Sequence, residues 1–182
     1  MLKQTGIATK EMFESLLPDE NRRQSAPYAF MECYENIPCD PCQTSCPHNA
    51  VHLEHINALP TCDFDTCTGC TRCVAVCPGL ACFVIDETVS DGKVKITLPH
   101  EMFPLPEANS TVYALGRDGS VVGEAEVVRV LSSKAMDRTN LISILVDKTL
   151  LYDVRSIKVK ELYENPSPGN LADGGSSEAP KK

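Results

Sequence analysis

Hydrophobic and polar residues in the C-terminal half of the chain follow the pattern of half-buried strands. Five segments are β-rich or alternate in this way: KVKITL, TVYAL, VVGEAEVVRVL, NLISILV and VRSIKV. Asp118 and Gly119 provide a turn between the second and the third. The pattern predicts a small all-β module of about five strands, a barrel or a sandwich, over residues 91–164.

The N-terminal part of the chain has a helical pattern instead. The stretch TKEMFESLL at 9–17 brings its apolar residues to one helix face, with Thr9 as a candidate N-cap, and Pro18 ends it. We therefore expect residues 1–31 to be an N-terminal helical extension. At the opposite end, residues 165–182 are rich in Pro, Gly and Ser, which predicts a disordered tail.

Charge and the lack of long apolar runs limit the classes of partner. The 182-residue chain has a net charge of −8, whereas nucleic acids and anionic membrane surfaces select basic proteins. It contains no apolar run as long as a signal peptide or a membrane span. We expect a cytoplasmic protein that binds neither nucleic acid nor membranes.

All ten cysteines lie between Cys33 and Cys82. In a reducing compartment such a group is more often metal-binding than disulfide-bonded, so residues 32–90 are interpreted as a metal-binding domain. The segment CTGCTRCVAVCP gives C-x2-C-x2-C-x3-C-P, the bacterial ferredoxin motif, in which three cysteines bind one [4Fe-4S] cluster and the fourth binds another. Zinc sites more often use two separated pairs of ligands.

A second, nearly complete motif lies about thirty residues upstream, in CYENIPCDPCQTSCP. Its first position is Asn36, and Cys33 three residues earlier can loop back to replace it, with Cys62 as the substitute if Cys33 does not. The spacing therefore predicts two [4Fe-4S] clusters, the first bound by Cys33, Cys39, Cys42 and Cys77 and the second by Cys46, Cys67, Cys70 and Cys73.

The other candidate side chains have simpler interpretations. Cys82 precedes an apolar run and is interpreted as a small buried hydrophobe. His48, His52 and His55 are interpreted as surface or outer residues rather than ligands, and Asp63 as a cap or turn former. No catalytic constellation is recognisable in the sequence, so no catalytic residue is predicted.

Residues 33–86 resemble a bacterial-type two-[4Fe-4S] ferredoxin domain, a family that repeats a strand, helix, helix, strand unit about a pseudo-two-fold axis. The segments FMECYENIPCDPC and CPGLACFVID are also similar to iron–sulfur subunits of flavin-dependent amine and amino-acid dehydrogenases. These resemblances imply an α+β fold with a ferredoxin-type domain before the β module, and a flavoprotein dehydrogenase subunit as partner in a hetero-oligomer.

Together these features predict a non-catalytic electron-transfer subunit of an oxidoreductase complex, with the β module as a docking surface. Three alternatives remain open: a freely diffusing ferredoxin, a self-contained iron–sulfur enzyme whose β module forms a substrate pocket, and a structural zinc module. A visible absorption spectrum separates iron–sulfur protein from colourless zinc protein, and turnover by the isolated chain separates enzyme from subunit.

Overall fold

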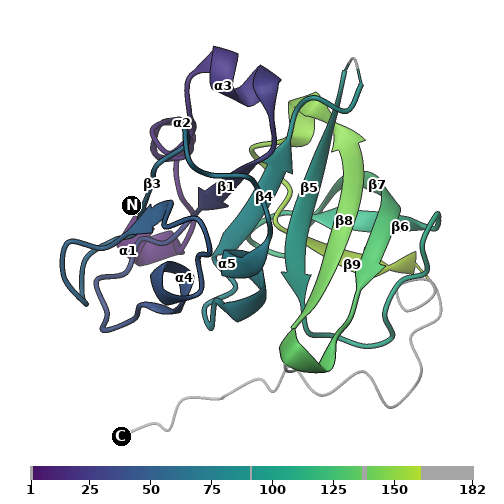
Figure 1. The fold of residues 1–182 in the computed structure, drawn as a ribbon. Helices are drawn as coiled ribbons and strands as arrows, with labels where there is room; N and C mark the ends of the chain where they lie inside the picture. The colour runs from purple at the N-terminus through teal and green to yellow at the C-terminus, as the bar shows by residue number, and fades with distance from the viewer. Residues whose placement is uncertain (1, 91, 137–138, 161–182) are drawn as a thin grey trace, which may run out of the picture.

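The computed structural model describes residues 2–90, 92–136 and 139–160, so the expected tail at 165–182 lies outside the described residues. The fold is mixed, with short helices and one seven-stranded antiparallel sheet (Figure 1). In spatial order the strands are β1 (Tyr28–Met31), β4 (Cys82–Asp86), β5 (Lys93–His100), β8 (Asn140–Asp147), β7 (Val121–Leu131), β6 (Thr111–Leu115) and β9 (Ser156–Val159).

The five strands predicted for the C-terminal half are confirmed as β5 to β9. Apolar residues alternate along these strands because one face of the sheet is buried. Val94, Ile96 and Leu98 of β5 are fully buried on that face. They belong to the same core as Ile142 and Ile144 of β8. The last strand, β9, also contacts β5, so the sheet curves around this core. Two 3₁₀ turns, η1 (Lys134–Met136) and η2 (Lys148–Leu150), flank β8.

The predicted turn between β6 and β7 is present. Gly119 has a φ of +78°, which few residues other than glycine adopt, and the Asp118 carboxylate accepts a hydrogen bond from the Ser120 amide at 3.0 Å. Further along β7 the register shifts between Val127 and Arg129. Val128 is left out of the pairing with β8 at this bulge, and its side chain is exposed.

The N-terminal part is only partly helical. It contains α1 (Leu2–Thr5), α2 (Lys10–Glu14) and α3 (Glu20–Ser25), and the hydroxyl of Thr9 caps α2 as predicted, although α2 ends before the expected residue 17. The interpretation of residues 1–31 as a helical extension is wrong at its end, where β1 is a strand paired with β4. Since all four residues of β1 are buried, the alternation that reveals a half-buried strand is missing.

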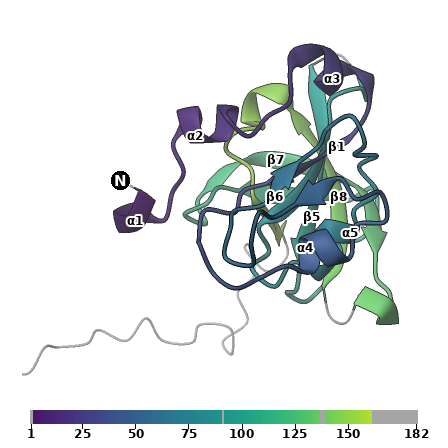
Figure 2. The same ribbon diagram turned by 60° about the vertical axis from the view of Figure 1, so that its left-hand side comes forward.

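The cysteine segment has two halves of similar construction. After β1 come α4 (Pro41–Thr44) and β2 (Val51–His52), and then β3 (Thr61–Cys62), α5 (Arg72–Val76) and β4. Strand β1 pairs with β4, β2 pairs with β3, and the two helices contact each other (Figure 2). Within the described residues each half has one helix, not the two that the resemblance implies.

The cysteine segment and the β module share one sheet. Strand β4 pairs with β5 through Val84↔Thr97, Ile85↔Ile96 and Asp86↔Lys95, so the ladder runs across the predicted boundary at residue 90. The cysteine segment and the β module are therefore joined by backbone hydrogen bonds within one continuous sheet. In the part of the chain that the structure describes, no helix has the length and apolar character needed to cross a membrane.

Candidate metal centres

The structure brings nine of the ten cysteines around two small cavities. Cavity A is lined by five cysteines together with apolar side chains that include Ile37, Leu53 and Pro78. Its four predicted ligands are Cys33, Cys39, Cys42 and Cys77. Three of these come from the first motif and its lead-in, and Cys77 arrives from the second motif at the end of α5.

Cavity B takes one cysteine from the first motif and three from the second. The cysteines on its wall are Cys46, Cys67, Cys70 and Cys73. Cys46 follows α4 and comes from the first motif, whereas the other three belong to the second motif. Of the predicted ligands, each cavity thus takes three from one half of the segment and one from the other, the same grouping as the spacing predicts.

The two exchanged cysteines stand in matching turns. In CPHNA and CPGLA the fourth residue, Asn49 or Leu80, has a φ of 51°, and the fifth donates its amide back to the cysteine. The distances are 3.3 Å from the Ala50 nitrogen to Cys46 Sγ and 3.3 Å from the Ala81 nitrogen to Cys77 Sγ. A positive φ turns the next amide towards the sulfur, where it favours the thiolate.

The second motif is held against the N-terminal part by a different set of contacts. The Ala29 amide of β1 donates to Cys67 Sγ at 3.3 Å. The guanidinium of Arg22 donates to the carbonyl oxygens of Phe64, at 2.7 Å, and Cys67, at 2.8 Å. Gly69 lies so close to Pro27 that a Cβ there would be 2.7 Å from the proline Cβ. The partners Arg22, Pro27 and Ala29 lie outside both motifs, and no sequence pattern predicted these contacts.

Several thiols have shifted pKa values. A hydrogen bond from Cys62, with help from the Gly69 and Ala29 amides, lowers the pKa of Cys67 to about 5. A hydrogen bond from Cys82, with help from the Ala81 and Gly79 amides, lowers the pKa of Cys77 to about 6. Burial raises the pKa of Cys33 and of Cys39 instead. These contacts therefore favour the thiolate, the form that binds metal, at Cys67 and Cys77.

The two cysteines left over by the motifs lie next to predicted ligands. Cys62 lines neither cavity, but it pairs across β2 and β3 with Val51, which borders cavity B. This position contrasts with the expectation that Cys62 could substitute for Cys33, which lines cavity A. Cys82 is buried, as expected. It also borders cavity A, which its interpretation as a small buried hydrophobe did not predict.

The thiols are spread around the walls of the two cavities. Within residues 2–90, 92–136 and 139–160, no three His, Cys, Asp or Glu side chains gather in the way that would hold a single metal ion. Ligands of a cubane bind four different irons, so they surround the cluster rather than converge on a point. Four thiols per cavity, with backbone amides directed at their sulfurs, therefore fit a [4Fe-4S] cluster.

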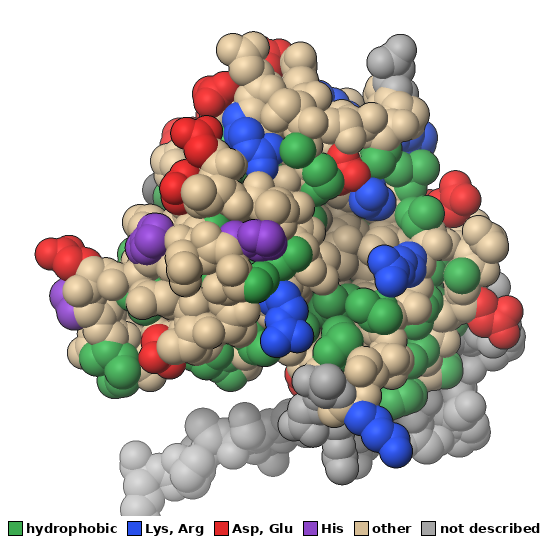
Figure 3. Space-filling model, viewed as in Figure 1, with side chains coloured by type: hydrophobic (Ala, Val, Ile, Leu, Met, Phe, Trp, Pro, Cys, Tyr) green, Lys and Arg blue, Asp and Glu red, His purple; other side chains and the backbone are tan. Residues whose placement is uncertain are grey.

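The polar residues near the cavities are peripheral. His48, His52 and His55 are exposed, and the exposed histidines gather over the cysteine segment (Figure 3). His48 and Arg72 border cavity B. The Asp63 carboxylate accepts a hydrogen bond from the Asp65 amide at 3.0 Å, which confirms its interpretation as a turn former.

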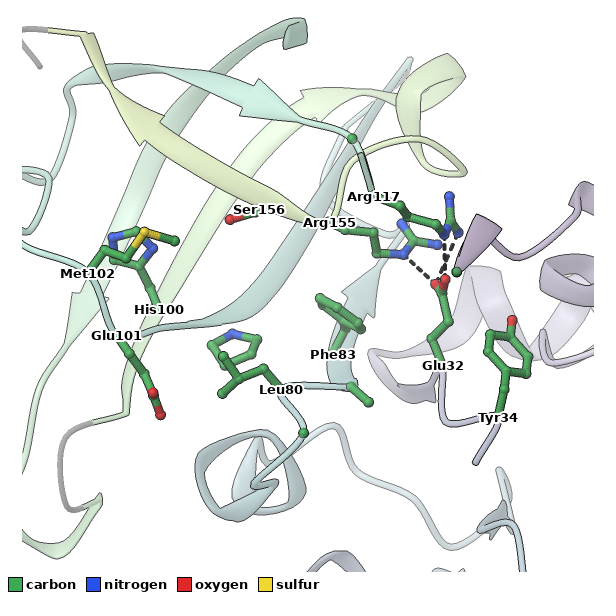
Figure 4. A pocket seen from close by; sticks show the side chains of 15 residues that line it. Glu32, Tyr34, Leu80, Phe83, His100, Glu101, Met102, Arg117, Arg155 and Ser156 are labelled. Carbon is green, nitrogen blue, oxygen red and sulfur yellow. Dashed lines mark hydrogen bonds and ion pairs between the residues drawn. The ribbon is translucent and has the colours of Figure 1, made fainter. Parts of the chain in front are cut away.

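A third cavity lies between the cysteine segment and the β module (Figure 4). Its volume is about 570 Å³. Its lining includes Glu32, Tyr34 and Leu80 from one part and His100, Arg117 and Arg155 from the other. The Glu32 carboxylate accepts hydrogen bonds from both arginines, and the guanidinium of Arg155 lies over the rings of Phe13, Phe30 and Phe83. This buried ion triad joins the residue before Cys33 to the β module.

The chain matches no protein-family model, and neither a curated protein nor a solved structure shows significant similarity to it.

Proposed function

We propose that this chain is an electron-transfer subunit that holds two [4Fe-4S] clusters and relays single electrons from a flavoprotein dehydrogenase. Cluster 1 would be held by the four cysteines of cavity A and cluster 2 by those of cavity B. The domain between residues 28 and 86 would then be of the ferredoxin type, with β1 as its first strand.

One observation carries the proposal. Of the eight predicted ligands, three from one half of the segment and a fourth from the other half line each cavity, with Cys77 as the fourth for cavity A and Cys46 for cavity B. This exchange is typical of two-cluster ferredoxins, and a pair of separate zinc sites would not require it. Two clusters sharing loops in this way are neighbours, which suits a relay.

The roles of the chain's own residues follow from the geometry. When bound, each cluster supplies a carrier that gains and loses one electron at a time. The amides of Ala29, Ala50 and Ala81 point at ligand sulfurs and offset part of the negative charge gathered there. Apolar side chains around cavity A, such as Ile37 and Leu53, limit the access of water.

A surface for electron exchange lies beside cavity A. Ile37 is 52% exposed and Ile56 is 58% exposed, and the Ile56 carbonyl accepts a hydrogen bond from the Cys39 amide at 3.0 Å. Exposed apolar side chains this close to a ligand suit contact with a protein partner. Acidic Glu35 and Glu54 nearby suit a basic rim on that partner.

The decisive experiment is analysis of the full chain purified without oxygen. We expect about eight iron and about eight sulfide per chain, a broad visible absorption band that bleaches on reduction, and EPR signals from two interacting clusters. Colourless protein containing zinc would refute the proposal. Purification from native extract should also bring down a flavin-containing protein, whereas a chain that is monomeric there would be a diffusing ferredoxin.

The third cavity supports a second candidate, a self-contained enzyme. Its volume of about 570 Å³ is within the range of small-molecule sites, and it lies between the cysteine segment and the β module. Incubation of the purified chain with amines and amino acids distinguishes the two functions. Bleaching of the visible band without any flavoprotein would favour the enzyme.

A further inference from the structure

The ion triad in the wall of the third cavity carries an unbalanced positive charge. The Glu32 carboxylate accepts hydrogen bonds from two guanidinium groups, those of Arg117 and Arg155. Both guanidinium groups also donate to backbone carbonyls of residues 151–154, which are neutral. All three side chains of the triad are about nine-tenths buried, so water screens the surplus charge poorly.

Two hydrogen-bond donors beside the triad lack an acceptor. The Tyr34 hydroxyl and Nη2 of Arg155 are buried, and neither has a hydrogen-bond partner among residues 2–90, 92–136 and 139–160. Both residues line the third cavity. The aromatic rings below the Arg155 guanidinium stabilise its charge but do not neutralise it. Since buried donors are nearly always paired in proteins, this end of the cavity suits an anionic group that accepts hydrogen bonds.

The opposite end of the cavity adds no net positive charge. Figure 4 shows the triad on one side, His100, Glu101 and Met102 on the other, and Phe83 between them. Burial lowers the pKa of His100, which is therefore neutral at neutral pH. The Glu101 carboxylate is exposed and accepts a hydrogen bond from the Thr139 hydroxyl at 2.7 Å. An anion is thus attracted to the triad and not to the far end.

We propose that the third cavity binds a small monocarboxylate with an apolar body, and that its charge lowers the reduction potential of cluster 1. The carboxylate lies beside the triad, where one negative charge balances the surplus, and the apolar body lies against Leu80 and Phe83. The cavity volume of about 570 Å³ is sufficient for such a molecule. A doubly charged phosphate exceeds the surplus charge and leaves the apolar wall uncovered.

The cavity is adjacent to two ligands of cluster 1. Glu32 and Tyr34 flank Cys33 in the sequence, and Ala81, which also lines the cavity, donates its amide to Cys77 Sγ at 3.3 Å. Reduction adds a negative charge to the cluster, so an anion nearby opposes it and lowers the potential. This coupling rests on the proposed function, whereas the binding site consists of the chain's own residues.

Isothermal titration calorimetry of the anaerobically purified full chain tests the site with benzoate and its uncharged analogue benzamide. Benzoate should bind at least about tenfold more tightly, because only its charge differs. Ser156 lines the cavity between its two ends (Figure 4). Ser156→Glu places a carboxylate there and should bind benzoate at least about tenfold more weakly than Ser156→Gln, the uncharged variant of the same size.

Redox titration of the cluster-loaded chain followed by EPR tests the coupling, with cluster 1 identified as the signal lost in Cys33→Ala. Benzoate should lower the potential of cluster 1 more than that of cluster 2, and benzamide should change neither. Absence of benzoate binding, equal binding of benzoate and benzamide, or equal benzoate affinity in the two Ser156 variants would overturn the site. Binding without a change in potential would overturn the coupling. A wild-type chain without clusters would refute the proposed function, while the calorimetry still decides on the binding site.

Discussion

The guanidinium of Arg22 donates a hydrogen bond of 2.8 Å to the backbone carbonyl of Cys67, forty-five positions further along the chain. The same side chain donates to the carbonyls of Phe64, Ala26 and Pro27. A residue of the N-terminal part thus fixes the loop that begins the second cysteine motif. The conformation of cavity B therefore depends on residues outside the cysteine segment.

Arg22→Ala should weaken retention of cluster 2 while leaving cluster 1 in place. Hydrogen bonds from a charged donor contribute about 1.5–3 kcal/mol each, and the substitution removes several that hold the loop. Iron analysis after storage should show loss towards about four per chain. Arg129→Ala, on the exposed side of β7, is the control and should retain the iron of the wild type. Equal loss from both variants would contradict the prediction.

Gly69→Ala should prevent assembly of cluster 2. Gly69 has a φ of +64°, which costs other residues about 1–2 kcal/mol, and the added Cβ would meet Pro27 Cβ at 2.7 Å. Since Gly69 separates Cys67 from Cys70, a shifted backbone moves two ligands. Gly79→Ala, in the turn directly after Cys77 and Pro78, is the matched control, because its Cβ would meet no atom within 4 Å. EPR should show one cluster in the first variant and two in the second.

The sequence predicted the elements whose signals are local. Alternation identified the five strands of the β module, and Thr9 identified the cap of α2. The cysteine spacing grouped eight thiols into two sets of four, and the structure places each set around one cavity. Spacing is enough to bring these thiols together because neighbouring cysteines on a short loop have little freedom.

The features missed by sequence reasoning depend on distant partners. Strand β1 is buried on both faces, so its residues do not alternate, and only its pairing with β4 defines it. Cys82 was recognised as buried, but its place on the wall of cavity A arises from the packing of β4 against α5. The ion triad of Glu32 with Arg117 and Arg155 likewise joins residues far apart in sequence.

Glu32→Gln should destabilise the whole chain. Its carboxylate and both guanidinium groups are each about nine-tenths buried, so removal of the negative charge leaves two buried cations without a counter-ion. Breaking such a group costs about 3–5 kcal/mol, or roughly 10 °C in Tm for a chain of this size. Glu14→Gln, which breaks the exposed pair with Lys10, should change Tm by no more than about 2–3 °C. Similar Tm values for the two variants would contradict this.

Glu87 should make stability depend on acid pH. Burial raises the pKa of its carboxyl, but hydrogen bonds from Arg23, Lys148 and Tyr28 outweigh burial and lower it. Because the folded pKa lies below the unfolded one, the stabilisation is complete above about pH 4.5 and is lost as pH falls through the folded pKa. The Tm difference between wild type and Glu87→Gln should thus be large at neutral pH and shrink in acid. A difference that stays constant with pH would exclude this role.

Cys33→Ala should remove cluster 1, whereas Cys62→Ala should leave about eight iron per chain. The upstream motif lacks a cysteine at Asn36, so a ligand of cavity A has to come from outside the regular spacing. Cys33 lines cavity A, while Cys62 lines neither cavity and is poorly placed to replace it. The iron content of Cys33→Ala should fall to about four, with the EPR signal of a single cluster free of coupling to a second. The reverse result, iron lost from Cys62→Ala and retained in Cys33→Ala, would reassign the fourth ligand. Loss from both variants would mean that the thiol of Cys62 is needed to hold Cys67 in its binding position.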